Sequence, residues 1–181
     1  MTYPEAEAIL HEYTKGESLL RHALSVSLVM RAYGDKLGED PEQFAIAGLL
    51  HDADYEMYPE EHPNIIVNRL RDMGEEALAY AISAHYTHWG NPAKATLDKA
   101  LLACDELTGF IIAVAQVRPQ GLEGMTPKSV TKKLKTASFA ASVDREEVRK
   151  GAEALGVDMN EHIAFIISVL QQHAEALGFA E

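Results

Sequence analysis

Histidine and aspartate residues occur in apolar, helix-forming stretches of this sequence, where their side chains would point toward the protein interior. His51 falls on the same predicted helix face as Phe44 and Ala47, and Asp52 follows it directly. His22 lies on the apolar face of an earlier predicted helix. Imidazole and carboxylate groups together suit Mn, Fe, Co, Ni or Zn, and they also admit Mg. Convergence of these groups would therefore create a divalent-metal site.

Asp105 repeats this pattern on a later apolar stretch, where it shares a face with Leu101 and Ile112. A carboxylate that points into a protein core is costly unless a cation or hydrogen-bond donors meet it. Each such residue taken alone has a simpler interpretation, because a lone inward histidine is more often hydrogen-bonded in the core, and a lone aspartate often caps a helix or pairs with arginine. That interpretation explains the whole set less well, so we expect one metal bound by His22, His51, Asp52 and Asp105.

The motifs around these residues resemble the HD superfamily of metal-dependent phosphohydrolases. The resembling segments are Arg21-His22-Ala23-Leu24, Ala47-Gly48-Leu49-Leu50-His51-Asp52 and Ala103-Cys104-Asp105-Glu106-Leu107, within residues 18–117. The resemblance implies a compact all-α helical bundle, the same four metal ligands, and hydrolysis of a phosphomonoester or phosphodiester, often of a nucleotide, through metal-activated water. Here the His-Asp pair continues as Ala53-Asp54 instead of Ile-Gly, and the Gly-Tyr-Pro signature of the cyclic dinucleotide branch is missing.

Further polar residues are candidates for supporting roles near this site. Asp54 and Glu56 follow the predicted ligands closely enough to position or deprotonate a water, so they are the candidate catalytic bases. An acidic loop facing solvent is an equal alternative for this pair. His85 ends an apolar predicted helix and His62 begins the preceding one. Some members of the resembled superfamily bind a second metal through histidines at comparable places, so His62 and His85 are candidate ligands of a second metal.

Basic residues gather in one short segment of an otherwise acidic chain. A helix over this segment would present a row of ammonium groups to a phosphate. The candidate substrate-binding residues are Lys128, Lys132, Lys133 and Arg118, and Lys135 extends the row. A solvated charged face is the alternative for this segment. We expect His88 in a loop, and His11, His162 and His173 at the surface.

The overall composition narrows the class of protein. The chain has 181 residues and a net charge of −12, with 28 acidic residues against 16 basic ones. We therefore expect a small phosphorylated substrate as the partner, and neither duplex nucleic acid nor an anionic membrane. A lone cysteine, Cys104, and a polar, acidic N-terminus without an apolar segment favour a reducing, cytoplasmic location. The oligomeric state cannot be inferred from these features.

Apolar residues recur mainly at three- and four-residue spacing, which predicts an all-α protein. The predicted helices cover residues 4–13, 18–37, 41–51, 59–73, 75–85, 96–117, 127–136, 144–155 and 160–177. We expect a single domain over residues 1–181, in which residues 18–117 form the metal-binding core and residues 118–181 a helical extension packed on it.

Two other functions stay open at this point. Some HD-type proteins use two irons for oxygenation, and this chemistry would require the extra ligands His62 and His85. The other alternative is a non-catalytic module that senses a nucleotide without converting it.

Overall fold

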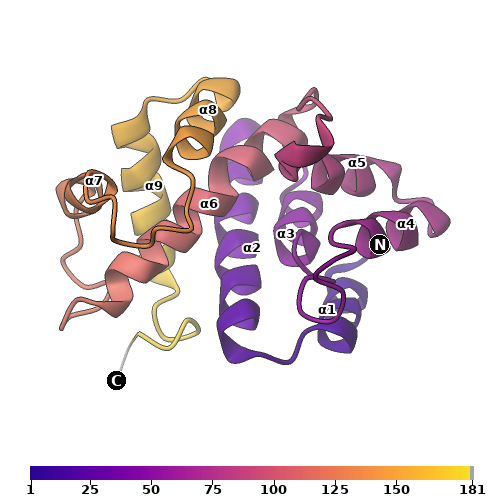
Figure 1. The fold of residues 1–181 in the computed structure, drawn as a ribbon, viewed down its shortest axis with the longest axis horizontal. Helices are drawn as coiled ribbons and strands as arrows, with labels where there is room; N and C mark the ends of the chain where they lie inside the picture. The colour runs from indigo at the N-terminus through magenta and orange to yellow at the C-terminus, as the bar shows by residue number, and fades with distance from the viewer. Residues whose placement is uncertain (180–181) are drawn as a thin grey trace.

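The protein folds entirely into helices in the computed structural model, which describes residues 1–179 (Figure 1). In chain order the elements are α1 (Tyr3–Tyr13), α2 (Glu17–Leu37), α3 (Pro41–Leu50), α4 (Asn64–Asp72), α5 (Glu76–His85), a 3-10 helix η1 (Thr87–Trp89), α6 (Thr96–Gln116), α7 (Pro127–Leu134), α8 (Arg145–Leu155) and α9 (Met159–Gln172). The described residues contain no strand, so the all-α expectation is confirmed. None of these helices is long and apolar enough to cross a membrane.

Two of the predicted helices differ clearly from the observed ones. The helix predicted from residue 59 begins only at Asn64, and hydrogen-bonded turns occupy the segment before it. Pro63 disfavours helical geometry at the residue that precedes it, which explains the late start. The last helix ends at Gln172 instead of residue 177, because His173 leaves helical geometry with φ −117° and ψ 21°. The turn that follows buries Leu177.

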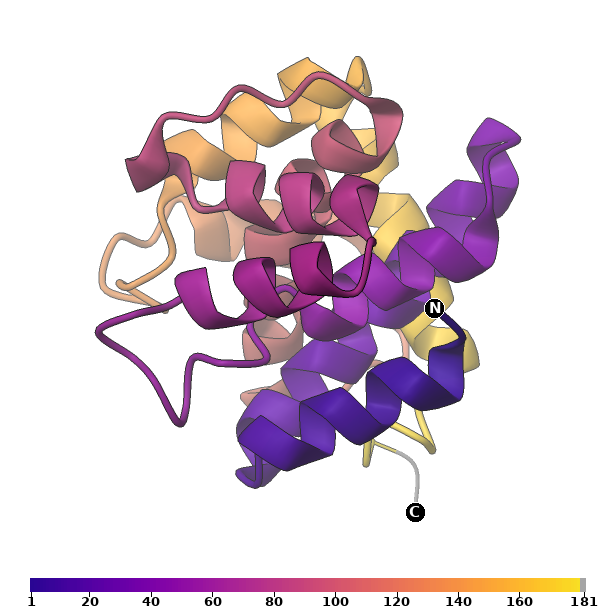
Figure 2. The same cartoon turned by 90° about the vertical axis from the view of Figure 1, so that its right-hand side faces the viewer.

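Helices α2 and α6 run through the middle of the molecule. In Figure 1, α7, α8 and α9 lie on one side of this pair, and α1, α3, α4 and α5 lie on the other. The view in Figure 2 shows α4 and α5 packed side by side. The ligand-bearing helices are therefore central to the fold. The division into a core and a C-terminal extension stays a prediction.

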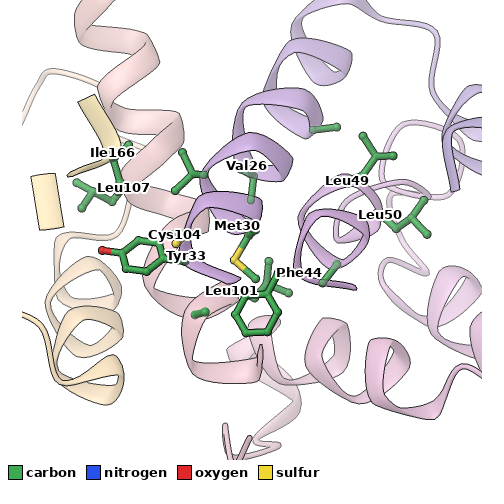
Figure 3. Close-up of a cluster of buried hydrophobic side chains, with 14 of the residues drawn as sticks. Val26, Met30, Tyr33, Phe44, Leu49, Leu50, Leu101, Cys104, Leu107 and Ile166 are labelled. Carbon is green, nitrogen blue, oxygen red and sulfur yellow. The ribbon is translucent and has the colours of Figure 1, made fainter. Parts of the chain in front are cut away.

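A close approach between α2 and α3 fixes the position of His51. A Cβ atom added at Gly48 would lie 2.8 Å from the carbonyl oxygen of Val26 and 2.9 Å from the Cα atom of Ser27. Only glycine allows the two backbones to come this near. Figure 3 shows buried side chains of both helices packed together, among them Met30 of α2 and Phe44 of α3. His51 follows Gly48 by one turn and thus faces the centre of the molecule.

The C-terminal helix α9 is joined to this centre through a buried histidine. His162 is almost fully buried, so the expectation that it lies at the surface is wrong. The Tyr33 hydroxyl lies 2.5 Å from its Nδ1 atom, and its Nε2 atom lies 2.8 Å from the carbonyl oxygen of Ala103. The tyrosine therefore donates to Nδ1, and Nε2–H donates to the carbonyl. These two bonds connect α9 to both α2 and α6.

Candidate metal centre

The four predicted ligands converge, although they come from three helices. His22 lies in α2, His51 ends α3 with Asp52 directly after it, and Asp105 lies in α6. The Nε2 atoms of His22 and His51 are 3.0 Å apart, and Asp105 Oδ1 lies 3.0 Å from the first and 3.1 Å from the second. Asp52 Oδ2 lies 3.7 and 3.4 Å from the same two nitrogens. One ion could therefore contact one atom from each side chain.

A second group of ligand atoms lies directly beside the first. Asp52 Oδ1 is 3.2 Å from His62 Nε2 and 3.5 Å from His85 Nε2. Asp52 thus belongs to both groups and directs one carboxylate oxygen toward each. Asp105 approaches the second group as well, with Oδ2 4.0 Å from His85 Nε2. The structure therefore brings His62 and His85 to the place where a second metal would need them.

Three of these histidines are held in one ring orientation by their outer nitrogen. His51 and His85 each donate Nδ1–H to the backbone carbonyl three residues earlier, at 2.7 and 2.5 Å. His62 donates Nδ1–H to Asp54 Oδ1 at 2.6 Å. The Nε2 lone pair of each neutral ring then points inward, which is the arrangement that metal-binding histidines usually show. Hydrogen bonds within the chain therefore fix the orientation of these three rings.

The electrostatics of the cluster call for a cation at its centre. A neutral His51 ring would present a lone pair to the carboxylate oxygens of Asp52 and Asp105, so that acceptors would face acceptors. Burial lowers the pKa of His51, but the charges of these two aspartates outweigh it and raise the pKa well above its usual value. Burial likewise opposes ionisation of Asp105, yet the neighbouring histidines hold its pKa far below the ordinary range. Protons compensate the aspartates here, and a divalent metal would fit the same donor set.

The two predicted catalytic bases do not reach the cleft at this cluster. Asp54 is fully buried, and its carboxylate accepts from His62 Nδ1 and, at 2.9 Å, from the N–H of Ile66. It therefore holds the ring of His62, a candidate ligand, in place, and it does not line the cleft. Glu56 points elsewhere and accepts the N–H groups of Lys15 and Gly16 at 2.8 and 3.0 Å. Its carboxylate thus accepts hydrogen bonds from backbone N–H groups just before α2.

The cluster opens into a cleft of about 1090 Å³. The predicted ligands that line it are His22, Asp52, His62, His85 and Asp105. One wall is formed by the end of α5 and the segment after it, including Tyr86, Thr87, His88 and Asn91. The opposite wall comes from α8 and the segment just before it, through Ala140, Ser142, Val143, Asp144, Glu147 and Lys150. The second wall comes from outside the segment that carries the motifs.

The predicted substrate-binding residues do not line this cleft. Lys128 and Lys132 are exposed on α7, and Lys133 stacks its ammonium group over the Phe139 ring at 4.7 Å. Arg118 is occupied by the backbone carbonyls of Gly121 and Glu123. Residues Lys128, Lys132, Lys133 and Arg118 are therefore not brought to the metal centre, and the solvated charged face describes the lysines better.

Four charged residues of the cleft, Glu106, Asp144, Glu147 and Lys150, had no role in the site assigned from the sequence. Glu106 follows Asp105 and lines the cleft, where burial and the charge of Asp105 raise its pKa to about 7. Lys150 lines the opposite wall from α8. Glu106 could have been suspected from its place beside a ligand. Lys150 carries no comparable signal, because a lysine on the polar face of a helix is common in sequences.

Comparison with protein families supports the same centre. The HD domain model matches residues 19–115, which is more than half of the chain and includes all the ligand residues named above. Neither the curated proteins nor the solved structures yield a match. The chain belongs to the HD domain family.

Proposed function

We propose that this protein is a metal-dependent phosphohydrolase that acts on a phosphomonoester or a phosphodiester. The observation that carries the proposal is the pair of ligand groups, each with inward histidine nitrogens, that share Asp52. Family membership supports the same class of enzyme, since HD domains are mostly metal-dependent hydrolases. A bound divalent metal would supply Lewis-acid stabilisation of a phosphoryl group and a water of lowered pKa.

The residues of the chain would divide the remaining work as follows. His22, His51, Asp52 and Asp105 would hold one metal, and Asp52, His62 and His85 would hold the second. Asp54 would keep His62 in the ring orientation that binds.

Glu106 takes the role that the sequence had suggested for Asp54 and Glu56. It lines the cleft and directly follows Asp105 in the chain, so its carboxylate can face a molecule bound beside the candidate metal ligands. We therefore propose Glu106 as the group that exchanges a proton with water or with the leaving oxygen. Substitution by glutamine would keep the shape of the side chain and remove this exchange.

Elemental analysis of the purified protein is the first test. We expect about one or two transition-metal ions per chain in the wild type and clear loss in Asp52→Ala, because Asp52 serves both groups. The exposed Asp35 in α2 provides a control, since Asp35→Ala should retain the metal. A panel of phosphomonoesters and phosphodiesters with Mn, Co, Ni or Mg then tests turnover. A wild-type protein that binds no metal, even when supplied with it, would overturn the proposal.

The second ligand group also favours one other candidate function. Two metals bridged by a carboxylate, with His62 and His85 as extra ligands, would suit a di-iron oxygenase of the HD type. Oxygenase function predicts two irons per chain, visible absorption and oxygen consumption that depends on an organic substrate. Phosphate release without oxygen consumption would decide for the phosphohydrolase.

A further inference from the structure

The C-terminal wall of the cleft is held against the metal centre by a close helix contact. A Cβ atom added at Gly151 would lie 2.6 Å from the carbonyl oxygen of Leu102 and 2.9 Å from the Cα atom of Ala103. The α8 backbone therefore touches the α6 backbone within one turn of Asp105. Lys150 precedes this glycine, and its position places its side chain in the cleft wall.

This wall lies outside the residues that match the HD domain, which end at residue 115. Its side chains are thus additions to the family's metal centre. Glu147 and Lys150 lie three residues apart on α8 and line the cleft together, with Glu147 Oε1 3.9 Å from Lys150 Nζ. Glu147 is the more enclosed of the two, since 24% of its side chain is exposed against 54% for Lys150. Both side chains can therefore contact a molecule bound in the cleft.

Apart from the candidate metal ligands, acidic side chains outnumber basic ones among the described residues that line the cleft. Lys150 is the sole lysine, and no arginine occurs among the described residues that line it. Three carboxylates accompany it, from Glu106, Asp144 and Glu147. Asp144 is engaged as the helix cap of α8, where it accepts two backbone N–H groups at 2.8 and 3.2 Å. Glu147 lines the cleft too, and its only charged partner there is Lys150, at 3.9 Å.

The opposite wall offers polar groups without a permanent charge. Tyr86, Thr87 and Asn91 can donate or accept hydrogen bonds there, and His88 is exposed nearby. None of these supplies a fixed cation for a second anionic group. A phosphate in the cleft could pair with Lys150, whereas a second anionic group would find no further lysine or arginine among the described lining residues and would face the carboxylate of Glu147.

On the basis of the proposed function, we propose that Glu147 and Lys150 determine specificity: they admit phosphate esters whose organic part is neutral or cationic and reject esters that carry a second anionic group. Like charges in a partly enclosed cleft repel, and the effective dielectric there is lower than in water. Esters with several phosphates, such as nucleoside triphosphates, would be disfavoured for the same reason. The inference thus names a charge class of substrate for the proposed centre.

Three small esters of similar size test this inference by titration calorimetry on the protein saturated with Mn²⁺. Phosphoethanolamine has a cationic organic part, glycerol phosphate a neutral one and phosphoglycerate an anionic one. We expect phosphoglycerate to bind about tenfold more weakly than the other two, which corresponds to about 1.4 kcal/mol. Equal or tighter binding of phosphoglycerate, or no binding of any of the three, would overturn the inference.

Substitutions within α8 distinguish the effect of Glu147 on ester binding from that of Lys150. Glu147→Gln should tighten phosphoglycerate binding and leave glycerol phosphate nearly unchanged, so that the tenfold difference becomes about threefold or less. Lys150→Gln should weaken all three esters by a similar factor, because each carries the phosphate. Glu146→Gln is the matched control, since Glu146 lies on the same turn but outside the cleft. An unchanged discrimination in Glu147→Gln would contradict the assignment. The proposed function fails separately, by loss of metal binding or of hydrolysis.

Discussion

Two buried histidine sites of this protein differ in what their ring nitrogens meet. His51 and His162 both lie on apolar helix faces and are almost completely buried. Both nitrogens of His162 are paired within the chain, with the Tyr33 hydroxyl and a backbone carbonyl. His51 satisfies one nitrogen with a carbonyl and directs the other at Asp52 and Asp105. Burial therefore does not distinguish a structural histidine from a candidate metal ligand, whereas the partner of the second nitrogen does.

The same difference appears in the direction of the pKa shifts. Burial and the nearby charge of Lys36 lower the pKa of His162, and together they outweigh the hydrogen bond with the carbonyl of Ala103, which raises it. At His51 the effect of burial is outweighed by two aspartates, and the pKa rises. The first site is complete as a neutral ring, and the second requires a positive charge. The predictions below test that contrast.

The largest expected effect is the loss of metal from Asp105→Ala. This change removes an oxygen that lies 3.0 and 3.1 Å from two histidine nitrogens, so we expect the first metal to be lost and turnover to fall by about a hundredfold or more. The helical circular dichroism should persist. His162→Phe serves as the comparison, and it should keep the full metal content. Full metal content in Asp105→Ala would contradict the ligand assignment.

A smaller and more selective effect is expected from Asp54→Asn. The carboxylate that accepts from His62 Nδ1 loses its charge, so affinity for the second metal should fall about ten- to a hundredfold while the first metal is retained. Metal content measured against free metal concentration checks this result. Glu56→Gln is a suitable control, because Glu56 contacts only the start of α2. Equal weakening of both metals would show that Asp54 acts on the whole centre.

The sequence predicted the helical fold and the convergence of His22, His51, Asp52 and Asp105 because spacing on a helix determines which side chains face inward. It could not separate His162 from those residues, since a tyrosine 129 positions away supplies its partner. The same limit applies to Asp54 and Glu56, which face a histidine and two backbone N–H groups instead of the cleft. Lys150 reaches the cleft only through the packing of α8 on α6, which no local pattern encodes.

A moderate loss of stability is expected from His162→Phe. Phenylalanine fills a similar volume but leaves the Tyr33 hydroxyl and the Ala103 carbonyl without their buried partners. We expect the free energy of unfolding to fall by about 1–3 kcal/mol, measured by urea denaturation with the metal content held equal. Tyr33→Phe removes only one of the two bonds and should cost less. A neutral effect in His162→Phe would mean that water or repacking satisfies these groups.

The smallest effect concerns pH, where His162 and His62, a histidine of the metal cluster, should act in opposite directions. Because the pKa of His162 is lowered on folding, the unfolded chain binds more protons below about pH 6.5, and this contribution to stability is lost as the pH falls toward the folded-state pKa. At His62, by contrast, hydrogen bonds with Asp52 and Asp54 outweigh burial and raise the pKa to about 9. Without metal, its contribution is complete below about pH 6.5 and is lost as the pH rises through 9.

Urea denaturation from pH 5 to pH 7 can isolate the His162 contribution. The wild type should lose more stability than His162→Phe as the pH falls, by at most about 1.4 kcal/mol per pH unit. Both proteins contain the same candidate metal ligands, so the difference between them removes the titration that the two have in common. Identical slopes would show that His162 is protonated equally in the folded and unfolded chains, and the neutral ring assigned to it would then be incorrect.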